Sequence, residues 1–428
     1  MNTLRQAAQV LLIAALAACG GGAGETSESL APVTGVPEKT LCAEPGTAWE
    51  SKSLAELRLD PARLQDALTW ANLHTGLSVA VYRDGCLAAQ SALDTVTAEV
   101  PIDGWSMTKS VSSMIVGRAV TLGLYDLDRP IGTWVTEADA EHARITPRQL
   151  ITMTSGLHSN YVRDFALPLQ DRVCDALALP FDHEPGSYWQ YAQSTLDLLL
   201  YSVERATGRD IQEFAQAELF GPIGIDAGSY LWDRDPDNHT NAWAHLRMRN
   251  QDWARLGRLM LQNGRWNGQQ ILSADYVRQA LSRLPHNPAY GMLFWLNGGD
   301  WWEVPNVEGI DRGAGSVLAA GPADMFMFVG LGEQRTYMIP SRGLVVVRTG
   351  ERGSHEPDTR VALWSGRGGE VDHELLRRVL LAVTDVPYAD PGPYAGAGPH
   401  APPLEDSIYA DAFDTSELAQ AMTVPPCH

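Results

Sequence analysis

The segment 106–122 constrains the fold most, because it is apolar on nearly every face. A surface helix carries its apolar residues in one stripe, whereas a helix that is apolar all round is buried. We therefore expect a buried helix here, covered by other elements. The chain can supply that cover, since 45% of its 428 residues are hydrophobic. The same composition excludes a disordered or collagen-like chain.

Hydrophobic periodicity divides the rest of the chain into three blocks. Short apolar strands occur in the first and last blocks, and the middle block is helical. The expected helices are 61–75, 147–154, 195–207, 211–219, 250–263 and 370–383, and the expected strands are 77–82, 86–93, 325–329, 334–339 and 344–348. This order predicts an α/β lobe over about 55–122 and 300–385 plus an all-α lobe over about 123–299. A catalytic cleft would fall between the lobes.

The N-terminal residues 1–18 have the layout of a secretory signal, in which Arg5 precedes an apolar run that is too short to span a bilayer. The run ends in Leu16-Ala17-Ala18-Cys19-Gly20, which resembles the lipobox of bacterial lipoproteins. In that family the cysteine is diacylated, and two acyl chains are enough for stable anchoring. We therefore expect a lipid anchor on Cys19, a flexible tether over 19–45, and a domain that faces the periplasm of a bacterial cell envelope. The alternative is an ordinary signal peptide with a cysteine there by chance.

The net charge limits the kinds of partner that we expect, and the cysteine content bears on disulfide pairing. The formal charge of −20 repels phosphate backbones, so we expect no nucleic-acid partner. Once Cys19 is lipidated, four cysteines remain in an oxidising compartment, which permits three pairings. Because chain ends often lie close together, we expect the pairs Cys42–Cys427 and Cys86–Cys174, with four free thiols as the alternative. Beyond the domain at 46–385, the residues 386–428 are rich in proline and glycine and are expected to form a loosely packed tail.

Lysine is scarce, and its placement is informative. The chain has only Lys39, Lys52 and Lys109, and only Lys109 has a serine, Ser106, three residues before it. On a helix these positions share a face with Cβ atoms about 5–6 Å apart, so the amine can reach the hydroxyl. Burial lowers the pKa of a lysine, and the helix N-terminus favours an alkoxide. The pair therefore predicts a serine nucleophile with a lysine base. The alternative is a lysine that extends to solvent from the helix start.

The Ser106-x-x-Lys109 motif on an apolar helix resembles the penicillin-recognising serine hydrolases, in particular their class C β-lactamase-like branch. That branch includes esterases, D-aminopeptidases and 6-aminohexanoate-dimer hydrolases. Further segments resemble the family in order and spacing. They are 145–157, 185–193, 252–257 and 266–272. The resemblance covers about 60–385 and implies a β-lactamase/penicillin-binding-protein-like fold, in which helices flank an antiparallel sheet and a helical region is inserted.

The resemblance also implies roles for individual residues. Ser106 would be the acylated nucleophile and Lys109 its base partner. Tyr191 would relay the proton, either as a tyrosinate or as a tyrosine hydrogen-bonded to Lys109. The backbone N–H groups of Ser106 and Leu331 would form the oxyanion hole. The alternative for Tyr191 is a core aromatic with a satisfied hydroxyl.

Two departures from the family pattern limit the range of substrates that we expect. The asparagine of the family's Tyr-x-Asn motif is Gln193 here, a longer amide expected to bind substrate. No lysine is available for the third motif, whose strand carries Gly330, Leu331 and Gly332. In penicillin-degrading enzymes that lysine helps to bind the substrate carboxylate, so we expect inefficient β-lactam turnover. The two glycines would let the strand approach the substrate closely.

The remaining predictions concern the surroundings of the nucleophile. The residues expected to line the cleft are Trp105, Tyr161, Trp243 and His245. Asp103 is expected to cap the helix that carries Ser106. Because no His or Cys cluster has metal-ligand spacing and no Gly-rich loop leads from a strand into a helix, we expect no metal, nucleotide or other cofactor.

These observations predict a membrane-tethered serine hydrolase that cleaves a small-molecule ester or amide through an acyl-enzyme intermediate. One alternative is a D-amino-acid peptidase or weak β-lactamase that acts on peptidoglycan-related substrates. A second alternative is a non-catalytic penicillin-binding-like module. The presence of Ser106, Lys109 and Tyr191 together argues against the non-catalytic reading.

Overall fold

The computed structural model describes residues 40–46, 48–74, 78–159, 164, 171–306, 309–350 and 366–396. All of them belong to the second of the two units into which the chain divides, which begins at Pro32. The predictions for the signal peptide, for the lipid on Cys19, for Tyr161 and for Cys427 lie outside the described residues.

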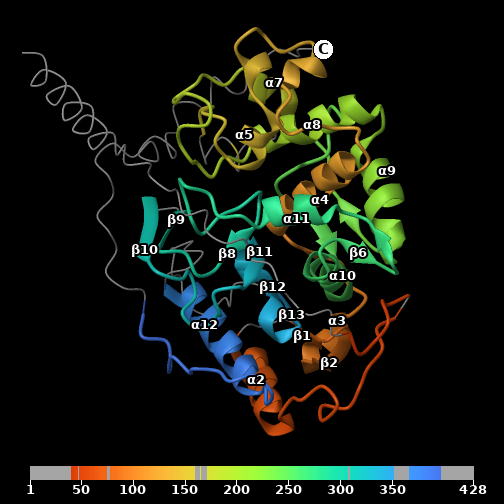
Figure 1. Ribbon diagram of the computed structural model, residues 1–428, viewed down its shortest axis with the longest axis vertical. Helices are drawn as coiled ribbons and strands as arrows, with labels where there is room; N and C mark the ends of the chain where they lie inside the picture. The colour runs from red at the N-terminus through yellow and green to blue at the C-terminus, as the bar shows by residue number, and fades with distance from the viewer. Residues whose placement is uncertain are drawn as a thin grey trace, which may run out of the picture. The chain divides into compact units, whose positions relative to one another are not determined.

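A six-stranded antiparallel sheet forms the frame of the described chain (Figure 1). Its strands are β1 (Ser78–Arg83), β2 (Cys86–Gln90), β8 (Trp295–Leu296), β11 (Phe326–Gly330), β12 (Gln334–Ile339) and β13 (Leu344–Thr349). The order across the sheet is β2-β1-β13-β12-β11-β8, so strands from both ends of the chain are neighbours, as the sequence predicts. Every residue of β1, β12 and β13 is buried, which accounts for the apolar majority in β1 and β13.

Helices cover both faces of this sheet (Figure 1). Helices α2 (Pro61–His74) and α12 (Gly366–Leu381) pack against each other, and α2 contacts β1. Helices α4 (Met107–Thr121) and α10 (Asn250–Leu261) contact the central strands. Strand β12 lies between these two helical layers, and its successive side chains point to one layer and then to the other.

The alternation along β12 is visible in its partners. The side chains of Arg335 and Tyr337 hydrogen-bond to Asp372 of α12. Thr336, which lies between them in sequence, contacts the sulfur of Met107 in α4 instead. Because successive strand residues point to opposite faces, α4 and α12 lie on opposite sides of the sheet.

The middle of the described chain is mainly helical. Its helices are α5 (Pro147–Ile151), α7 (Arg172–Leu177), α8 (Thr195–Thr207), α9 (Ile211–Ala215) and α11 (Ala274–Ala280), with short helical turns η1 (Ile131–Thr133), η2 (His142–Arg144), η3 (Gln216–Phe220) and η4 (Gly221–Ile223). Helices α5, α7 and α8 lie at the end away from α2 (Figure 1). The expected helix 195–207 is confirmed with the same bounds as α8. The expected helix 211–219 changes after Ala215 into the π-helical turn η3.

Three small strand pairings complete the fold. They are the sheet β3 (Ile102–Asp103), β5 (Leu246–Met248) and β4 (Leu231–Trp232), the hairpin β6 (Arg265–Trp266) and β7 (Gln269–Gln270), and the hairpin β9 (Trp301–Asn306) and β10 (Gly309–Ala314). The remaining elements are the helix α3 (Ala92–Thr97) and the turns η5 (Leu331–Glu333) and η6 (Pro340–Arg342). The pairing of β3 with β5 matters for function, because it brings His245 close to the segment that precedes α4.

The expected buried helix is confirmed as α4. Val111, Met114, Ile115 and Val116 have no exposed surface. The expected strand 86–93 is shorter than predicted, since β2 ends at Gln90. The physical reason is a helix cap: the Ser91 hydroxyl accepts a hydrogen bond from the Asp94 N–H at 3.2 Å and starts α3.

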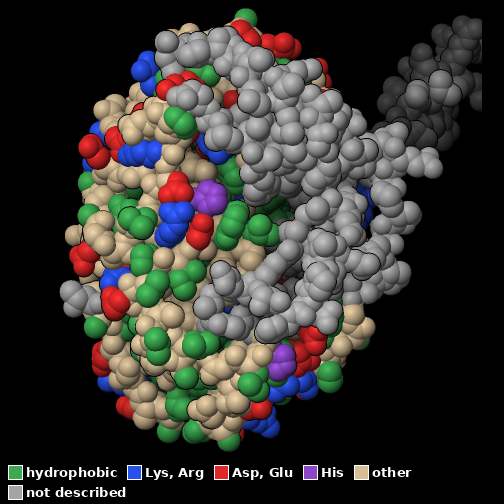
Figure 2. All heavy atoms as spheres, turned by 180° about the vertical axis from the view of Figure 1, so that it is seen from behind, with side chains coloured by type: hydrophobic (Ala, Val, Ile, Leu, Met, Phe, Trp, Pro, Cys, Tyr) green, Lys and Arg blue, Asp and Glu red, His purple; other side chains and the backbone are tan. Residues whose placement is uncertain are grey.

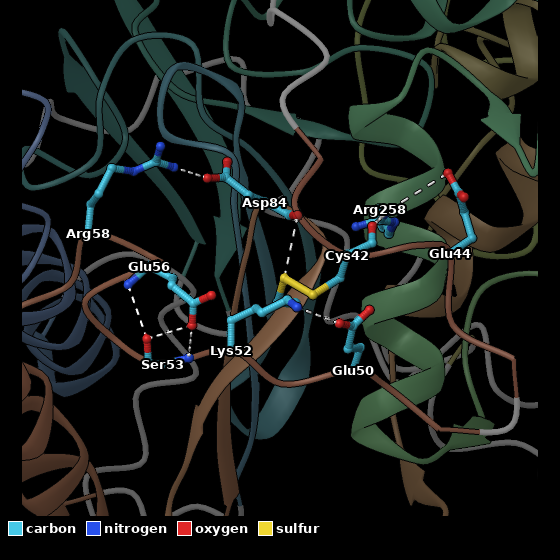
Figure 3. Close-up of a disulfide and its surroundings, with 10 residues drawn as sticks. Cys42, Glu44, Glu50, Lys52, Ser53, Glu56, Arg58, Asp84 and Arg258 are labelled. Atoms are coloured by element: carbon cyan, nitrogen blue, oxygen red, sulfur yellow. Dashed lines mark hydrogen bonds and ion pairs between the residues drawn. A yellow bond between two sulfur atoms is a disulfide. The ribbon is translucent and has the colours of Figure 1, made fainter.

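The predicted disulfide pairings are wrong, because Cys42 is bonded to Cys86 (Figure 3). The segment that carries Cys42 runs along the turn between β1 and β2, where the Leu41 N–H donates to the Asp84 carbonyl at 2.8 Å. This contact places Cys42 beside β2, within reach of Cys86. Cys174 is disulfide-bonded as well, with a partner outside the described residues.

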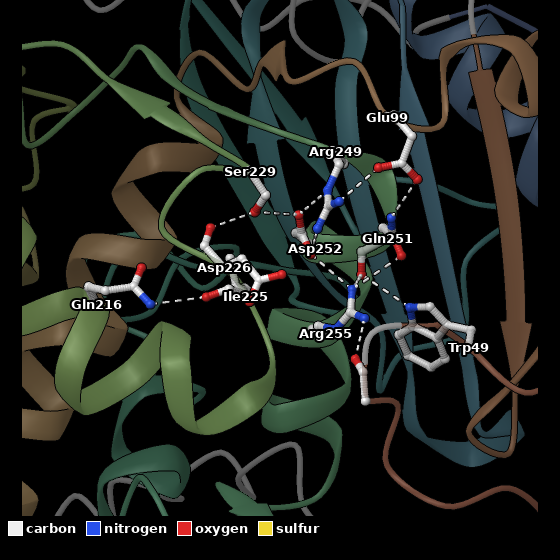
Figure 4. A network of polar contacts seen from close by, with 11 residues as sticks. Trp49, Glu99, Gln216, Ile225, Asp226, Ser229, Arg249, Gln251, Asp252 and Arg255 are labelled. Carbon is white, nitrogen blue, oxygen red and sulfur yellow. Dashed lines mark hydrogen bonds and ion pairs between the residues drawn. The ribbon is translucent and has the colours of Figure 1, made fainter.

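A buried ionic network joins the start of α10 to its neighbours (Figure 4). The Arg255 guanidinium donates to Asp252 at 2.9 Å and to the Gly46 carbonyl at 2.7 Å, and Arg249 donates to the same carboxylate at 2.7 Å. Neither Asp252 nor Arg255 has exposed side-chain surface. Breaking a buried ion pair leaves an uncompensated charge and is therefore costly. The segment 252–257, which resembles the family in sequence, thus has a structural role here.

On the face opposite to that of Figure 1, the described surface carries acidic, basic and apolar side chains side by side (Figure 2). The acidic excess of the chain is therefore interspersed with basic residues on this face. None of the helices within the described ranges combines the length and the hydropathy that a membrane span needs.

Candidate active site

Ser106 and Lys109 meet at the start of α4. Ser106 is half-buried and immediately precedes the first residue of the helix. Lys109 Nζ lies 2.7 Å from Ser106 Oγ and donates to the Trp243 carbonyl at 3.0 Å. Burial lowers the pKa of Lys109 well below its usual 10.5, against the opposing effect of the carboxylates of Asp164 and Asp197. The neutral amine, which can accept a proton from Ser106, is therefore available at lower pH than in a free lysine.

Tyr191 lies beside this pair. Lys109 Nζ is 4.9 Å from the centre of its ring, and the residue is 4% exposed. Burial raises the pKa of Tyr191 to about 12, although hydrogen bonds with Ser106 and Trp295 and the charge of Arg335 act in the opposite direction. At neutral pH the group is therefore a phenol. Of the two forms of Tyr191 expected from the sequence, the structure favours the neutral hydroxyl over the tyrosinate.

Three further aromatic rings hold Tyr191 in place. The ring centres of Trp189, Tyr290 and Trp295 lie 6.2, 6.1 and 5.8 Å from that of Tyr191. All three residues are buried. Tilted and edge-on ring packing of this kind fixes orientation as well as burying area. The Tyr191 hydroxyl is thus presented to Ser106 by a rigid support.

The turn that leads into α4 contains a backbone in the left-handed region. Trp105 has φ of +47°, a conformation that costs a residue with a side chain about 1–3 kcal/mol. The Asp103 carboxylate accepts from the Trp105 N–H at 2.8 Å and pairs with His245 Nδ1 at 2.8 Å. The His245 ring in turn lies 4.9 Å from that of Trp105. These contacts hold the turn that positions Ser106.

The same contacts correct the role predicted for Asp103. Ser106, not Asp103, is the residue that precedes the helix, and its side chain makes no capping hydrogen bond. The Asp103 carboxylate cannot serve as that cap because the Trp105 N–H and His245 engage its two oxygens. Trp105 and His245 are only half-buried, so they border the surface around Ser106.

The end of β11 lies against this turn. A Cβ atom on Gly330 would overlap the Gly104 carbonyl oxygen, so only glycine permits this approach. Gly332, inside η5, has φ of +70°, a left-handed conformation that favours glycine. The Arg335 guanidinium donates to the Gly330 carbonyl at 2.7 Å. Leu331 therefore follows directly after the point where β11 meets the segment that carries Ser106.

For the other predicted site residues, Gln193 and Trp243, the structure gives no side-chain hydrogen bond to Ser106 or Lys109 among the described contacts. Gln193 is 1% exposed, and its amide oxygen has no partner in the described part of the chain. Trp243 is buried rather than lining an opening, and its backbone carbonyl is what contacts Lys109. Within the described ranges, no group of three or more His, Cys, Asp or Glu side chains is arranged to hold a metal ion.

Sequence reasoning missed three residues that surround the catalytic pair. They are Asp197, Trp295 and Arg335. A signal existed for Asp197, because it is the one acidic residue in the apolar run 196–200. No comparable signal marks Trp295 or Arg335, since the chain is rich in both residue types.

Comparison with known proteins places this geometry in context. The beta-lactamase family profile matches residues 63–367. The chain is 28% identical over 184 residues to monacolin J acid methylbutanoyltransferase of Aspergillus terreus, covering 37% of this chain and 43% of that protein. It is 27% identical over 148 residues to lovastatin esterase of Penicillium rubens, covering 28% and 37%. The matches thus span less than half the length of these relatives.

Solved structures support the fold. A Bacillus anthracis protein provisionally assigned as a 6-aminohexanoate-dimer hydrolase superposes with a TM-score of 0.57 at 16% identity, over 82% of this chain and 89% of that one. The expected fold, an antiparallel sheet flanked by helices with a helical insertion, is therefore confirmed as β-lactamase/penicillin-binding-protein-like.

Proposed function

Because the chain belongs to the beta-lactamase family of penicillin-recognising serine hydrolases, we propose that it cleaves an ester or amide bond through an acyl-enzyme on Ser106. The observation that carries the proposal is the buried lysine whose Nζ lies 2.7 Å from Ser106 Oγ. The esterase and acyltransferase relatives support acyl transfer as the class of reaction.

The proposed acylation uses four groups. Lys109 takes the proton of Ser106, whose Oγ attacks the carbonyl carbon of the substrate. The N–H groups of Ser106 and Leu331 hold the oxyanion, and each such donor contributes about 2.7–4 kcal/mol to the transition state. Tyr191 gives its proton to the leaving oxygen or nitrogen as the bond to carbon breaks, and the ammonium of Lys109 returns a proton to Tyr191.

Deacylation repeats these roles with water in place of the leaving group. A water attacks the acyl carbon and gives its proton to Tyr191, which passes its own proton to Lys109. The bond between the acyl carbon and Ser106 Oγ then breaks, and the Lys109 ammonium returns a proton to Oγ, which restores the resting enzyme. An alcohol in place of water would give acyl transfer, the reaction named for the Aspergillus relative.

The proposed substrate is an ester or amide without a β-lactam carboxylate. The chain has no lysine after Lys109 to bind such a carboxylate through the third motif. Trp105 and His245 border Ser106 and would contact the substrate together with Gln193, Gly330 and Gly332.

The test is hydrolysis of p-nitrophenyl butyrate by the wild type and by Ser106→Ala. The variant is expected to lose activity by at least about 10³-fold. Ser110→Ala is the matched control, because its hydroxyl is buried in the same helix and bonds to the Leu293 carbonyl at 2.7 Å. Equal rates for the wild type and Ser106→Ala would refute the proposal. Nitrocefin turnover as fast as ester turnover would refute the substrate assignment.

We also propose that a lipid on Cys19 tethers the enzyme to the bacterial envelope, as the lipobox-like segment suggests. Radiolabelled palmitate should label the full chain expressed in a Gram-negative host, and Cys19→Ser should abolish that label. A label that survives the substitution would contradict the anchor.

A further inference from the structure

Asp197, in α8, lies beneath the catalytic pair and has no exposed side-chain surface. Its Oδ1 accepts from the Ala242 N–H at 2.9 Å, and its Oδ2 accepts from the Trp243 indole at 3.2 Å. The Trp243 carbonyl is the second hydrogen-bond acceptor of Lys109 Nζ, at 3.0 Å. One carboxylate therefore fixes both the backbone and the side chain of the segment that holds the lysine.

The Trp243 ring contacts two nitrogen-bearing side chains, Lys109 and Arg172. Lys109 Nζ and the Arg172 guanidinium carbon each lie 5.3 Å from ring centres of Trp243, and for the charged Arg172 this is within the range of cation–π attraction. Arg172 Nη1 also lies 4.0 Å from Asp197 Oδ2. Asp197, Trp243 and Arg172 thus form a cluster, here called the Trp243 clamp, that packs against Lys109.

Asp197 is placed to change its charge near neutrality. Burial raises its pKa to about 7, and the charge of Arg172 and the Ala242 N–H act in the opposite direction. The other carboxylates that face it, Asp235 and Asp164, raise the pKa further. Conversely, the charge of Asp197 raises the pKa of Lys109.

We propose that Asp197 is a positioning residue for Lys109, and that its charge sets the pH at which Lys109 becomes a base. The carboxylate orients Trp243, whose carbonyl holds the amine against Ser106. While ionised, the carboxylate also favours the ammonium form of Lys109. The inference rests on the proposed function, because it assigns Lys109 the role of base.

The experiment compares pH profiles of kcat/KM for p-nitrophenyl butyrate in the wild type and in Asp197→Asn. Loss of the negative charge favours the neutral amine. The acid limb of the profile is therefore expected to move to lower pH over the range in which Asp197 of the wild type is ionised. Because the Asn side chain cannot accept both hydrogen bonds, kcat at the plateau is expected to fall by about 10–100-fold.

Two further variants separate the two parts of the role. Trp243→Phe removes the indole donor but keeps the carbonyl and the charge of Asp197, so the plateau should fall while the acid limb stays in place. Asp94→Asn is the matched control, because that buried carboxylate bonds to Asn250 at 2.7 Å and has no contact with the Trp243 clamp in the described chain. The Asp94→Asn variant should keep the wild-type acid limb of the pH profile and the wild-type kcat at the plateau.

The outcomes distinguish this inference from the proposed function. Failure of a fluorophosphonate probe to label Ser106 in the wild type would overturn the proposed function itself. A labelled wild type with an Asp197→Asn variant that is folded and keeps the wild-type acid limb would overturn only the role of Asp197. If Asp197→Asn does not fold, a Trp243→Phe variant with an unchanged plateau overturns the positioning role.

Discussion

Burial acts in opposite directions on the two titratable residues next to Ser106. Loss of solvent disfavours charge, so it lowers the pKa of Lys109 and raises that of Tyr191 to about 12. The lysine is thereby a better proton acceptor at a given pH than a free lysine, and at neutral pH the tyrosine retains a proton to donate. A pair of groups whose pKa values are pushed apart in this way identifies the base and the acid of a site.

Tyr191→Phe tests the acid role. Removing a proton donor to the leaving group should lower kcat/KM by about 10²–10⁴-fold for an ethyl or butyl ester. The loss should be much smaller for a p-nitrophenyl ester, whose leaving group departs without protonation. Tyr290→Phe is the matched control, since Tyr290 is buried against the same ring. An equal loss for both kinds of ester would contradict the assignment of Tyr191 as the acid.

The sequence was informative at the residue scale only where spacing along one helix determines contact. Ser106 and Lys109 are three residues apart on α4, so their meeting follows from helix geometry. Asp197 and Trp295 reach the site from α8 and β8, and only tertiary packing brings them there. The protonation states of Lys109 and Tyr191 likewise depend on burial, which spacing does not determine.

At the scale of elements, the contact between β11 and the turn before α4 decides where the oxyanion donors lie. Gly330 permits this contact because it lacks a side chain, and Arg335 holds the Gly330 carbonyl from the other side. Arg335 is itself fixed by Asp372 of α12 at 3.0 Å. A helix on one face of the sheet therefore supports the position of Leu331 relative to α4 on the opposite face.

Gly330→Ala tests this arrangement. The added methyl group would meet the Gly104 carbonyl and force β11 away from α4, at a cost of about 1–3 kcal/mol of stability. Because the Leu331 N–H would move with the strand, kcat should fall by about 10²–10³-fold while KM changes little. Gly228→Ala is the control, since a Cβ there meets nothing within 4 Å. A folded Gly330→Ala variant with wild-type kcat would exclude Leu331 as an oxyanion donor.

Element predictions succeeded where a long periodic pattern carried them and failed where a single local contact decided the boundary. Helix α8 and strand β12 have the bounds that their residue patterns predict. Strand β2 stops early because one serine, Ser91, caps α3. Helix α9 passes into a π-helical turn that its sequence pattern does not reveal.

At the scale of the whole molecule, strands from the two ends of the chain form one sheet, as their apolar patterns and the helical block between them predict. The disulfides were not predictable in the same way. The proximity of chain ends is a statistical tendency, whereas Cys42 pairs with Cys86 because of one specific backbone contact at Asp84. Several pairings satisfied the sequence equally well, and the fold selects among them.

The Cys42–Cys86 bond ties the segment before α2 to the sheet and closes a loop with a sequence separation of 44 (Figure 3). A loop of this length restricts the unfolded chain enough to contribute about 4 kcal/mol in the chain-entropy account. In the native state the Cys42 carbonyl also accepts from Arg258 at 3.2 Å, and this contact remains when the sulfurs are removed. The segment should therefore keep its place without the bond.

The double substitution Cys42→Ser and Cys86→Ser is accordingly expected to act on the unfolded state more than on the folded one. The free energy of unfolding in urea should fall by about 2–4 kcal/mol. The value of kcat/KM per folded molecule should stay unchanged, because the described contacts of the bond include none of the residues around Ser106. An unchanged unfolding free energy would mean that the loop is already restricted in the unfolded chain. A lost kcat/KM at full folding would show instead that the segment before α2 helps to position α4.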